Sequence, residues 1–126
     1  MIDSASIPTW VHNLYNENQG IQRTLAEGVQ ARIFAGEHAM LSIVRFEPNA
    51  THAPHSHPQE QWGVLLEGEG TRLQGSEAVP VKAGDFWHTP GGVSHTFQAG
   101  PAGALVLDIF SPPRPEYIQR EVYPCA

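Results

Sequence analysis

Residues 54–68 read PHSHPQEQWGVLLEG, and this stretch decides the fold. Two histidines one residue apart, His55 and His57, precede an apolar run that ends at a glycine. Alternate side chains of a β-strand share a face, so both imidazoles point the same way. Gln61 keeps that phase, whereas Glu60 points to the opposite face unless a bulge intervenes. The stretch therefore predicts a strand that carries a metal site into a buried pocket.

Neutral imidazole is the commonest protein ligand for divalent transition metals. An isolated His-x-His pair is often only surface decoration, but here an apolar strand and a third in-phase polar side chain follow it. A further candidate, His95, lies far downstream, and the fold has to bring it back to the pair. Alternation favours Gln61 over Glu60 as the remaining ligand, and Glu60 stays the alternative.

The rest of the chain alternates short apolar runs with turn residues. Its 126 residues suit one domain with a single core, and 12 Gly, 11 Pro and 40% apolar residues favour an all-β sandwich or barrel. The run 71–74 is expected to be the hairpin partner of 61–69. The expected strands span residues 29–34, 39–46, 61–69, 71–74, 79–81, 85–88, 94–97 and 104–110.

Charge and cysteine content restrict the partners and the compartment. Thirteen acidic residues against seven basic ones argue against nucleic acid and anionic membranes as partners. Cys125 is the single cysteine, so no intramolecular disulfide can form and a reducing compartment fits best. No segment approaches the roughly 20 apolar residues that span a bilayer. We expect a soluble, cytoplasmic protein with a small, anionic substrate.

Several residues outside the histidine stretch have a less specific pattern. Four apolar side chains near the N-terminus are spaced as on a helical turn or two, in an arm that either packs over the body or crosses to a second subunit. They are Trp10, Val11, Leu14 and Tyr15. His52 is a candidate for the rim of the pocket. Four aromatic side chains are expected in the barrel core and the pocket lining, namely Trp62, Phe86, Trp87 and Phe97.

Two stretches in order resemble the two motifs of the cupin superfamily, in its small single-domain form. Residues 54–68 are similar to the first motif, with Gln61 and Gly68 in register. Residues 84–95, GDFWHTPGGVSH, are similar to the second motif. The asparagine usual four residues after the last histidine is Ala99 here, a departure that touches no ligand.

This resemblance implies a double-stranded β-helix in a single domain, 1–126. The barrel would span 28–112, between a short N-terminal arm, 1–27, and a C-terminal tail, 113–126. One divalent transition metal ion would lie in the barrel mouth, and zinc, nickel, iron, manganese and copper all suit nitrogen and oxygen donors. Many cupins pair, so a homodimer is expected. The implied ligands are His55, His57, Gln61 and His95.

The segment 107–117, LDIFSPPRPEY, resembles the end of the small cupins of pectin degradation, which open 4,5-unsaturated uronates. The resemblance implies that Asp108 is the acid/base group, Phe110 a wall of the sugar pocket, and Arg114 the clamp on the substrate carboxylate. An arginine fork does match a carboxylate bidentately. The alternative is structural: Asp108 caps a turn or pairs with Arg114, and Phe110 belongs to the core.

The expected function is therefore that of a metal-dependent enzyme for ring opening or ketonisation of unsaturated uronates. A cupin dioxygenase or a polyketide cyclase is an alternative on the same scaffold, and the dioxygenase needs a redox metal. A non-catalytic small-molecule-binding cupin is a third hypothesis. Oxygen uptake and metal identity separate the first two, and tight binding without turnover would indicate the third.

Overall fold

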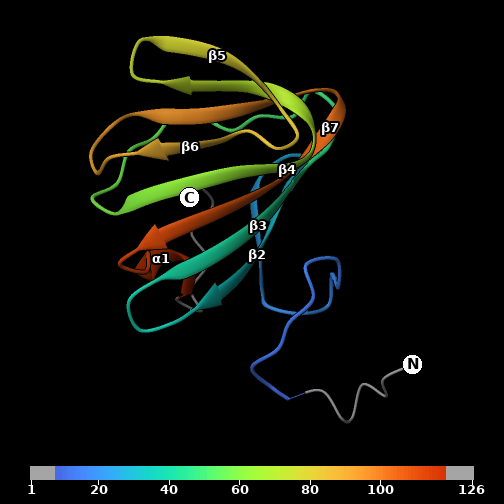
Figure 1. Ribbon diagram of the computed structural model, residues 1–126, viewed down its shortest axis with the longest axis vertical. Helices are drawn as coiled ribbons and strands as arrows, with labels where there is room; N and C mark the ends of the chain where they lie inside the picture. The colour runs from blue at the N-terminus through green and yellow to red at the C-terminus, as the bar shows by residue number, and fades with distance from the viewer. Residues whose placement is uncertain (1–7, 119–126) are drawn as a thin grey trace.

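The computed structural model describes residues 8–118, and these form an antiparallel β-structure with one short helix (Figure 1). Alternation of apolar and polar residues, broken by glycine and proline, produces the strands. The elements are β1 (Ile21–Ala26), β2 (Val29–Ala35), β3 (Met40–Phe46), β4 (Glu60–Gln74), β5 (Glu77–Lys82), β6 (Phe86–Thr89), β7 (His95–Ser111) and α1 (Pro115–Ile118).

The strands follow the order β1-β2-β3-β7-β4-β5, and β6 pairs with β4 beside β5. The two long strands β4 and β7 pair along their whole length and curve through the molecule (Figure 1). One end of β4 pairs with β6 and the other with β5. This curled sheet is the double-stranded β-helix that the sequence predicted, and its concave side encloses the core.

One face of β3 supplies core residues. On β3, Met40, Val44 and Phe46 are buried, while Leu41 and Arg45 on the alternate face are exposed. Burial of such side chains contributes about 1.5–3 kcal/mol each. The core cluster consists of Leu25, Val29, Ala31, Ile33, Met40, Val44, Phe46, Leu65, Phe97, Ala99, Ala104, Val106, Phe110 and Tyr117.

The predicted hairpin between residues 61–69 and 71–74 is wrong, because both runs belong to the single strand β4. Instead of a turn, this part of β4 has two irregularities in the pairing with β7, between Leu65 and Glu67 and between Gly68 and Gly70. Gly68 has a φ of 85°, which a glycine adopts without strain. The hairpin turn comes later, between Gln74 and Glu77.

These irregularities change which residues of β4 face the interior. Before them Gln61 and Leu65 are buried, whereas beyond them the buried residue is Arg72. The buried positions of β4 are thus odd-numbered before the irregularities and even-numbered beyond them. An extra residue in a strand has this effect on alternation. Simple counting from Gln61 would place Arg72 outside the barrel.

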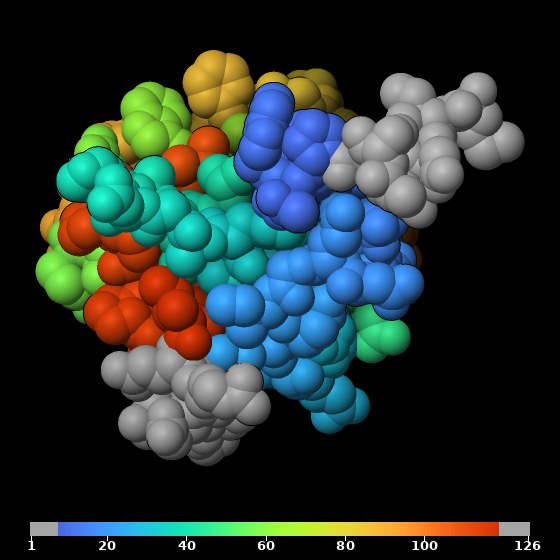
Figure 2. Space-filling view, turned by 90° about the horizontal axis from the view of Figure 1, so that it is seen from below, coloured from blue at the N-terminus to red at the C-terminus, as the bar shows by residue number. Residues whose placement is uncertain are grey.

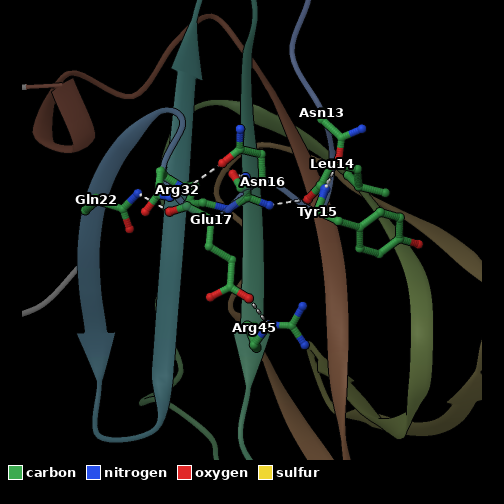
Figure 3. Close-up of polar contacts among 9 residues, drawn as sticks. Asn13, Leu14, Tyr15, Asn16, Glu17, Gln22, Arg32 and Arg45 are labelled. Carbon is green, nitrogen blue, oxygen red and sulfur yellow. Dashed lines mark hydrogen bonds and ion pairs between the residues drawn. The ribbon is translucent and has the colours of Figure 1, made fainter. Parts of the chain in front are cut away.

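The segment before β1 is fixed to the outer side of the sheet by two arginines (Figure 3). Arg32 on β2 donates hydrogen bonds to the backbone carbonyls of Leu14 and Asn16. Arg45 on β3 lies 3.9 Å from the carboxylate of Glu17. These contacts hold the described part of the arm on its own barrel.

The sheet begins at Ile21, inside the segment that the sequence assigned to the arm, because β1 pairs with β2. Residues 8–20 form turns rather than helical structure. Trp10 and Tyr15 are 78% and 57% exposed, so their spacing does not create a packed apolar face. The expectation of a helical arm is wrong because these side chains find no core to cover.

At the other end of the chain, α1 packs beside β2, and its red segment borders the blue of β1 and β2 in Figure 2. Tyr117 on this helix is 4% exposed and belongs to the core. Within residues 8–118, no helix has the length and apolar character needed to cross a membrane. Cys125 and the rest of the predicted tail after residue 118 lie outside the described residues.

The aromatic residues divide between two environments. Trp87 and Phe97 line the interior, as expected, and their rings stack 6.0 Å apart. Trp62 and Phe86 are 43% and 68% exposed on the outer face, so the expectation that they are core residues is wrong. Alternation explains Trp62, because its neighbour Gln61 faces inward.

Candidate metal centre

The fold brings the three histidines of the two motifs together. His55 and His95 face each other across an isolated β-bridge, with backbone N–O distances of 3.0 and 2.9 Å. His57 follows two residues later on the same face. One ring nitrogen from each of the three lies within 4.8 Å of the other two. His57 and His95 are buried, and His55 is partly buried.

The same kind of hydrogen bond orients each imidazole. The Nδ1 atoms of His55, His57 and His95 lie 3.3, 3.1 and 2.8 Å from backbone carbonyl oxygens. A carbonyl oxygen only accepts, so each Nδ1 carries the hydrogen and each Nε2 keeps its lone pair. Such contacts are typical of the outer shell that orients metal-binding histidines.

Two observations show that the site fits a cation. The Nε2 atom of His95 is buried without a hydrogen-bond partner among the described residues. The Nε2 atom of His57 lies 3.0 Å from Oε1 of Gln61, and the Gln61 amide group donates at 3.0 Å to Asp108. Two lone pairs therefore face each other. A metal ion bound by both atoms removes this repulsion.

Burial favours the neutral imidazoles that a metal needs. Loss of solvent lowers the pKa of His57 to about 4 and of His95 to about 3, and it lowers the pKa of His55 in the same direction. All three rings are therefore uncharged at neutral pH. Because His57 stays neutral, its Nε2 atom carries no proton that it could donate to the Gln61 oxygen.

The structure places Gln61, not Glu60, beside the histidines. Gln61 is 3% exposed and contacts His57, whereas Glu60 points to the outer face and pairs with His88 at 2.6 Å. Alternation within β4 puts the adjacent Glu60 and Gln61 on opposite faces. The expectation that the same strand carries His55 and His57 is wrong, because β4 begins at Glu60 and the chain bends at residues 58–59. The candidate ligand set is three imidazoles and one amide oxygen, which leaves the charge of a dication uncompensated.

Asp108 on β7 lies next to this set, as the acceptor of the hydrogen bond from Gln61. Burial raises the pKa of Asp108 to about 6, although Arg72 and the Gln61 hydrogen bond lower it. A carboxyl group with a pKa near neutrality can both accept and release a proton at physiological pH. Asp108 does not form the alternative ion pair with Arg114, because the carboxylate that pairs with Arg114 in residues 8–118 is Glu116.

Arg114 is enclosed by aromatic rings and by its own segment. Its guanidinium carbon lies 4.2 Å from the ring centroid of Tyr117 and 5.3 Å from that of Phe110. One terminal nitrogen donates to the Tyr117 hydroxyl at 2.9 Å, and the other lies 3.2 Å from the Glu116 carboxylate. Phe110 in turn packs edge-on against His57.

One enclosed pocket collects these groups. The pocket is lined by His55, Gln61, His95, Asp108, Phe110 and Arg114. His57 contacts the lining residue Gln61. Its volume is about 20 Å³, enough for one water molecule. The fold thus gathers all the candidate residues of the sequence into one site.

Sequence reasoning missed Arg72 and Tyr117, which line the same pocket. His52, expected at the rim, also lines it, and burial lowers the pKa of His52 to about 4. Tyr117 carried a weak signal, as an aromatic residue three positions after an arginine. Arg72 carried no signal, since alternation along β4 placed it outside.

Solved structures share this architecture. An RmlC-like cupin from Shewanella frigidimarina NCIMB 400 aligns with a TM-score of 0.71 at 23% identity, over 82% of this chain and 94% of that chain. KdgF from Halomonas sp. aligns with a TM-score of 0.72 at 26% identity, over 79% of this chain and 94% of that chain.

A longer protein is also similar. Oxalate decarboxylase from Bacillus subtilis, studied for its Mn(II) centers, aligns with a TM-score of 0.66 at 24% identity. The match covers 72% of this chain but only 27% of that chain. A search of curated protein sequences found no match. The model of the cupin domain family matches residues 42–110, more than half of the chain, and the protein therefore belongs to the cupin family.

Proposed function

We propose that this cupin is a metal-dependent enzyme that opens or ketonises 4,5-unsaturated uronates. The observation that carries the proposal is a protonatable carboxylate, Asp108, hydrogen-bonded at 3.0 Å to a candidate metal ligand, Gln61, in a pocket with two buried arginines. The resemblance of residues 107–117 to the small cupins of pectin degradation supports the substrate class. The fold match to KdgF agrees with a small single-domain cupin.

Conversion of an unsaturated uronate to its linear 5-keto-4-deoxy form is an isomerisation. Its net effect is to move one hydrogen from oxygen to carbon. A single acid/base group can carry that hydrogen, and Asp108 is the acid/base group of this proposal. When bound, a divalent metal ion supplies Lewis acidity that polarises substrate oxygens. Phe110 forms an apolar wall beside His57, and the arginines attract the carboxylate.

Turnover of a purified substrate tests the proposal. Full-length protein loaded with zinc, nickel or manganese is mixed with 4,5-unsaturated galacturonate, and loss of the absorbance of the conjugated double bond is followed. We expect metal-dependent loss above the spontaneous rate and one linear keto product. Chelation should stop the reaction, and re-addition of metal should restore it.

A His95→Ala variant is the matched control, because it removes one imidazole of the cluster and leaves Asp108 in place. It should lose metal and activity together. If the metal-loaded wild type leaves the absorbance at the spontaneous rate, the uronate proposal is wrong. Oxygen consumption with the same substrate would instead indicate a dioxygenase.

A further inference from the structure

Arg72 is a buried cation that forms no ion pair among the described residues, and the carboxylate whose charge acts on it, Asp108, lines the same pocket. The residue is 6% exposed, yet it forms no ion pair with any carboxylate in residues 8–118. Its hydrogen-bond partners are neutral: Nε donates to Gln74 at 3.3 Å and Nη2 donates to Thr89 at 2.8 Å. Removing a guanidinium from water is costly, so a buried arginine that has no ion pair and faces a pocket is suited to bind an anion there.

The guanidinium of Arg72 is held in place by a connected set of hydrogen bonds. Thr89 on β6 donates at 2.6 Å to the Gln74 side-chain oxygen that also accepts from Arg72. The Gln74 amide group donates at 2.9 Å to the backbone of His88. The plane of Trp87 supports the cation at 5.4 Å. This group is ordered in advance, which lowers the cost of binding a ligand.

Arg114 differs from Arg72 in this respect. Both terminal nitrogens of Arg114 already have partners, and one of these is the carboxylate of Glu116 at 3.2 Å. Its charge is therefore largely compensated within its own segment. Nε of Arg114 is buried without a partner, but of the two arginines in the pocket Arg72 is the one that has no carboxylate within ion-pair distance among residues 8–118.

Arg72 also lies where a ligand has room. With Trp87, it lines both the 20 Å³ pocket at the histidines and a second cavity of about 460 Å³ between β5 and β6. The rim of that cavity carries two carboxylates, and one of them, Asp85, lies 3.9 Å from Lys82. Arg72 therefore borders both the space at the histidines and the larger space.

We propose that Arg72 is a carboxylate-binding residue of this site, so that the anionic group of the substrate lies on the β5–β6 side of the histidine cluster. The substrate class rests on the proposed function, but the binding role of Arg72 does not depend on turnover. Arg114 then acts as a wall that holds Phe110 and Tyr117 rather than as the main clamp.

Binding of a stable uronate tests this role apart from catalysis. Zinc-loaded full-length protein is titrated calorimetrically with D-galacturonate, and with D-galactose as the uncharged control. We expect wild type to prefer galacturonate, and Arg72→Gln to weaken galacturonate binding about ten- to hundredfold while leaving galactose unchanged. Arg72→Lys, which keeps the charge but not the fork, should recover part of the loss.

Arg32→Gln is the matched control, since Arg32 is equally buried but lies on the outer side of β2. It should change stability and leave galacturonate binding unchanged. Zinc content and the unfolding midpoint are measured for every variant, and Arg72→Lys decides the question if Arg72→Gln does not fold. The inference is overturned if wild type and the Arg72 variants bind galacturonate equally, or if the affinity for both sugars falls in parallel. It is also overturned if wild type does not bind galacturonate.

These results separate the inference from the proposed function. If the protein turns over unsaturated galacturonate and this turnover does not depend on Arg72, the role of Arg72 is contradicted and the proposed function is supported. Binding of galacturonate that depends on Arg72, without turnover, would remove the function and leave the inference.

Discussion

At the scale of single residues, neighbouring side chains of β4 have opposite environments. Gln61 joins His57 to Asp108, while the adjacent Glu60 pairs with His88 on the outer face. The acidic residue next to the histidines in the sequence is thus excluded from the pocket, and the carboxylate comes from β7. The hydrogen bond between Gln61 and Asp108 fixes the amide oxygen toward the histidines.

Asp108→Asn tests the acid/base role, because asparagine keeps the shape and can still accept from Gln61. We expect kcat for the unsaturated uronate to fall at least about a hundredfold, since proton transfer typically contributes that much. Metal content should stay unchanged. Glu60→Gln is the control on the opposite face and should leave kcat as in wild type; an active Asp108→Asn enzyme would contradict the assignment.

At the scale of elements, the irregular pairing of β4 and β7 determines the interior. Two glycines with positive φ, Gly68 and Gly103, face each other there. A Cβ built on Gly68 would lie 2.1 Å from the backbone oxygen of Gly103. The site depends on this geometry, because it turns Arg72 inward near the end of β4, opposite Phe97 near the beginning of β7.

Gly68→Ala and Gly75→Ala form a matched pair that isolates this contact. Both positions have positive φ, but a Cβ on Gly75 meets nothing within 4 Å. The unfavourable backbone conformation should cost about 1–2 kcal/mol of unfolding free energy in each variant. The clash should add about 1–3 kcal/mol for Gly68→Ala. Urea denaturation measures both, and equal losses would show that β4 can relax around the added methyl group.

At the scale of the whole molecule, several buried histidines make stability depend on pH. Burial lowers the pKa of His52 and His57 to about 4 and that of His95 to about 3, from 6.5. Below pH 6.5 the unfolded chain binds protons that the folded protein does not, so the unfolding free energy falls as the pH falls. Asp108, whose pKa rises from 3.8 to about 6, acts in the opposite direction.

We therefore expect metal-free protein to lose stability from pH 6.5 toward pH 4, with a slope of up to about 1.4 kcal/mol per pH unit for each of these histidines. Urea denaturation in the presence of a chelator measures this slope. His52→Gln should reduce it, and replacement of the exposed His38 by Gln should not. A stability that is flat between pH 7 and pH 4.5 would contradict the expectation.

The sequence by itself determined the cupin barrel and the core of the candidate metal site. Alternation over a few residues is local, so the choice of Gln61 over Glu60 follows from the sequence wherever β4 goes, whereas the bridge of His55 to His95 positions the histidines. The two motifs are each continuous, and their resemblance to the cupin motifs implied His95 as the third histidine. Turn residues marked most strand ends, since glycine and proline restrict or permit backbone angles regardless of tertiary context.

Only the tertiary structure decided the rest. The glycines at 68–70 are compatible with a turn or with an irregular strand, and pairing with β7 selects the strand. That choice reverses alternation and brings Arg72 inside, which local counting cannot foresee. The partners of Arg114 likewise depend on how its segment folds back against Phe110. Which arginine of the pocket lacks an ion pair within the described residues is a property of long-range packing, and so the proposed anion-binding role of Arg72 could come only from the folded molecule.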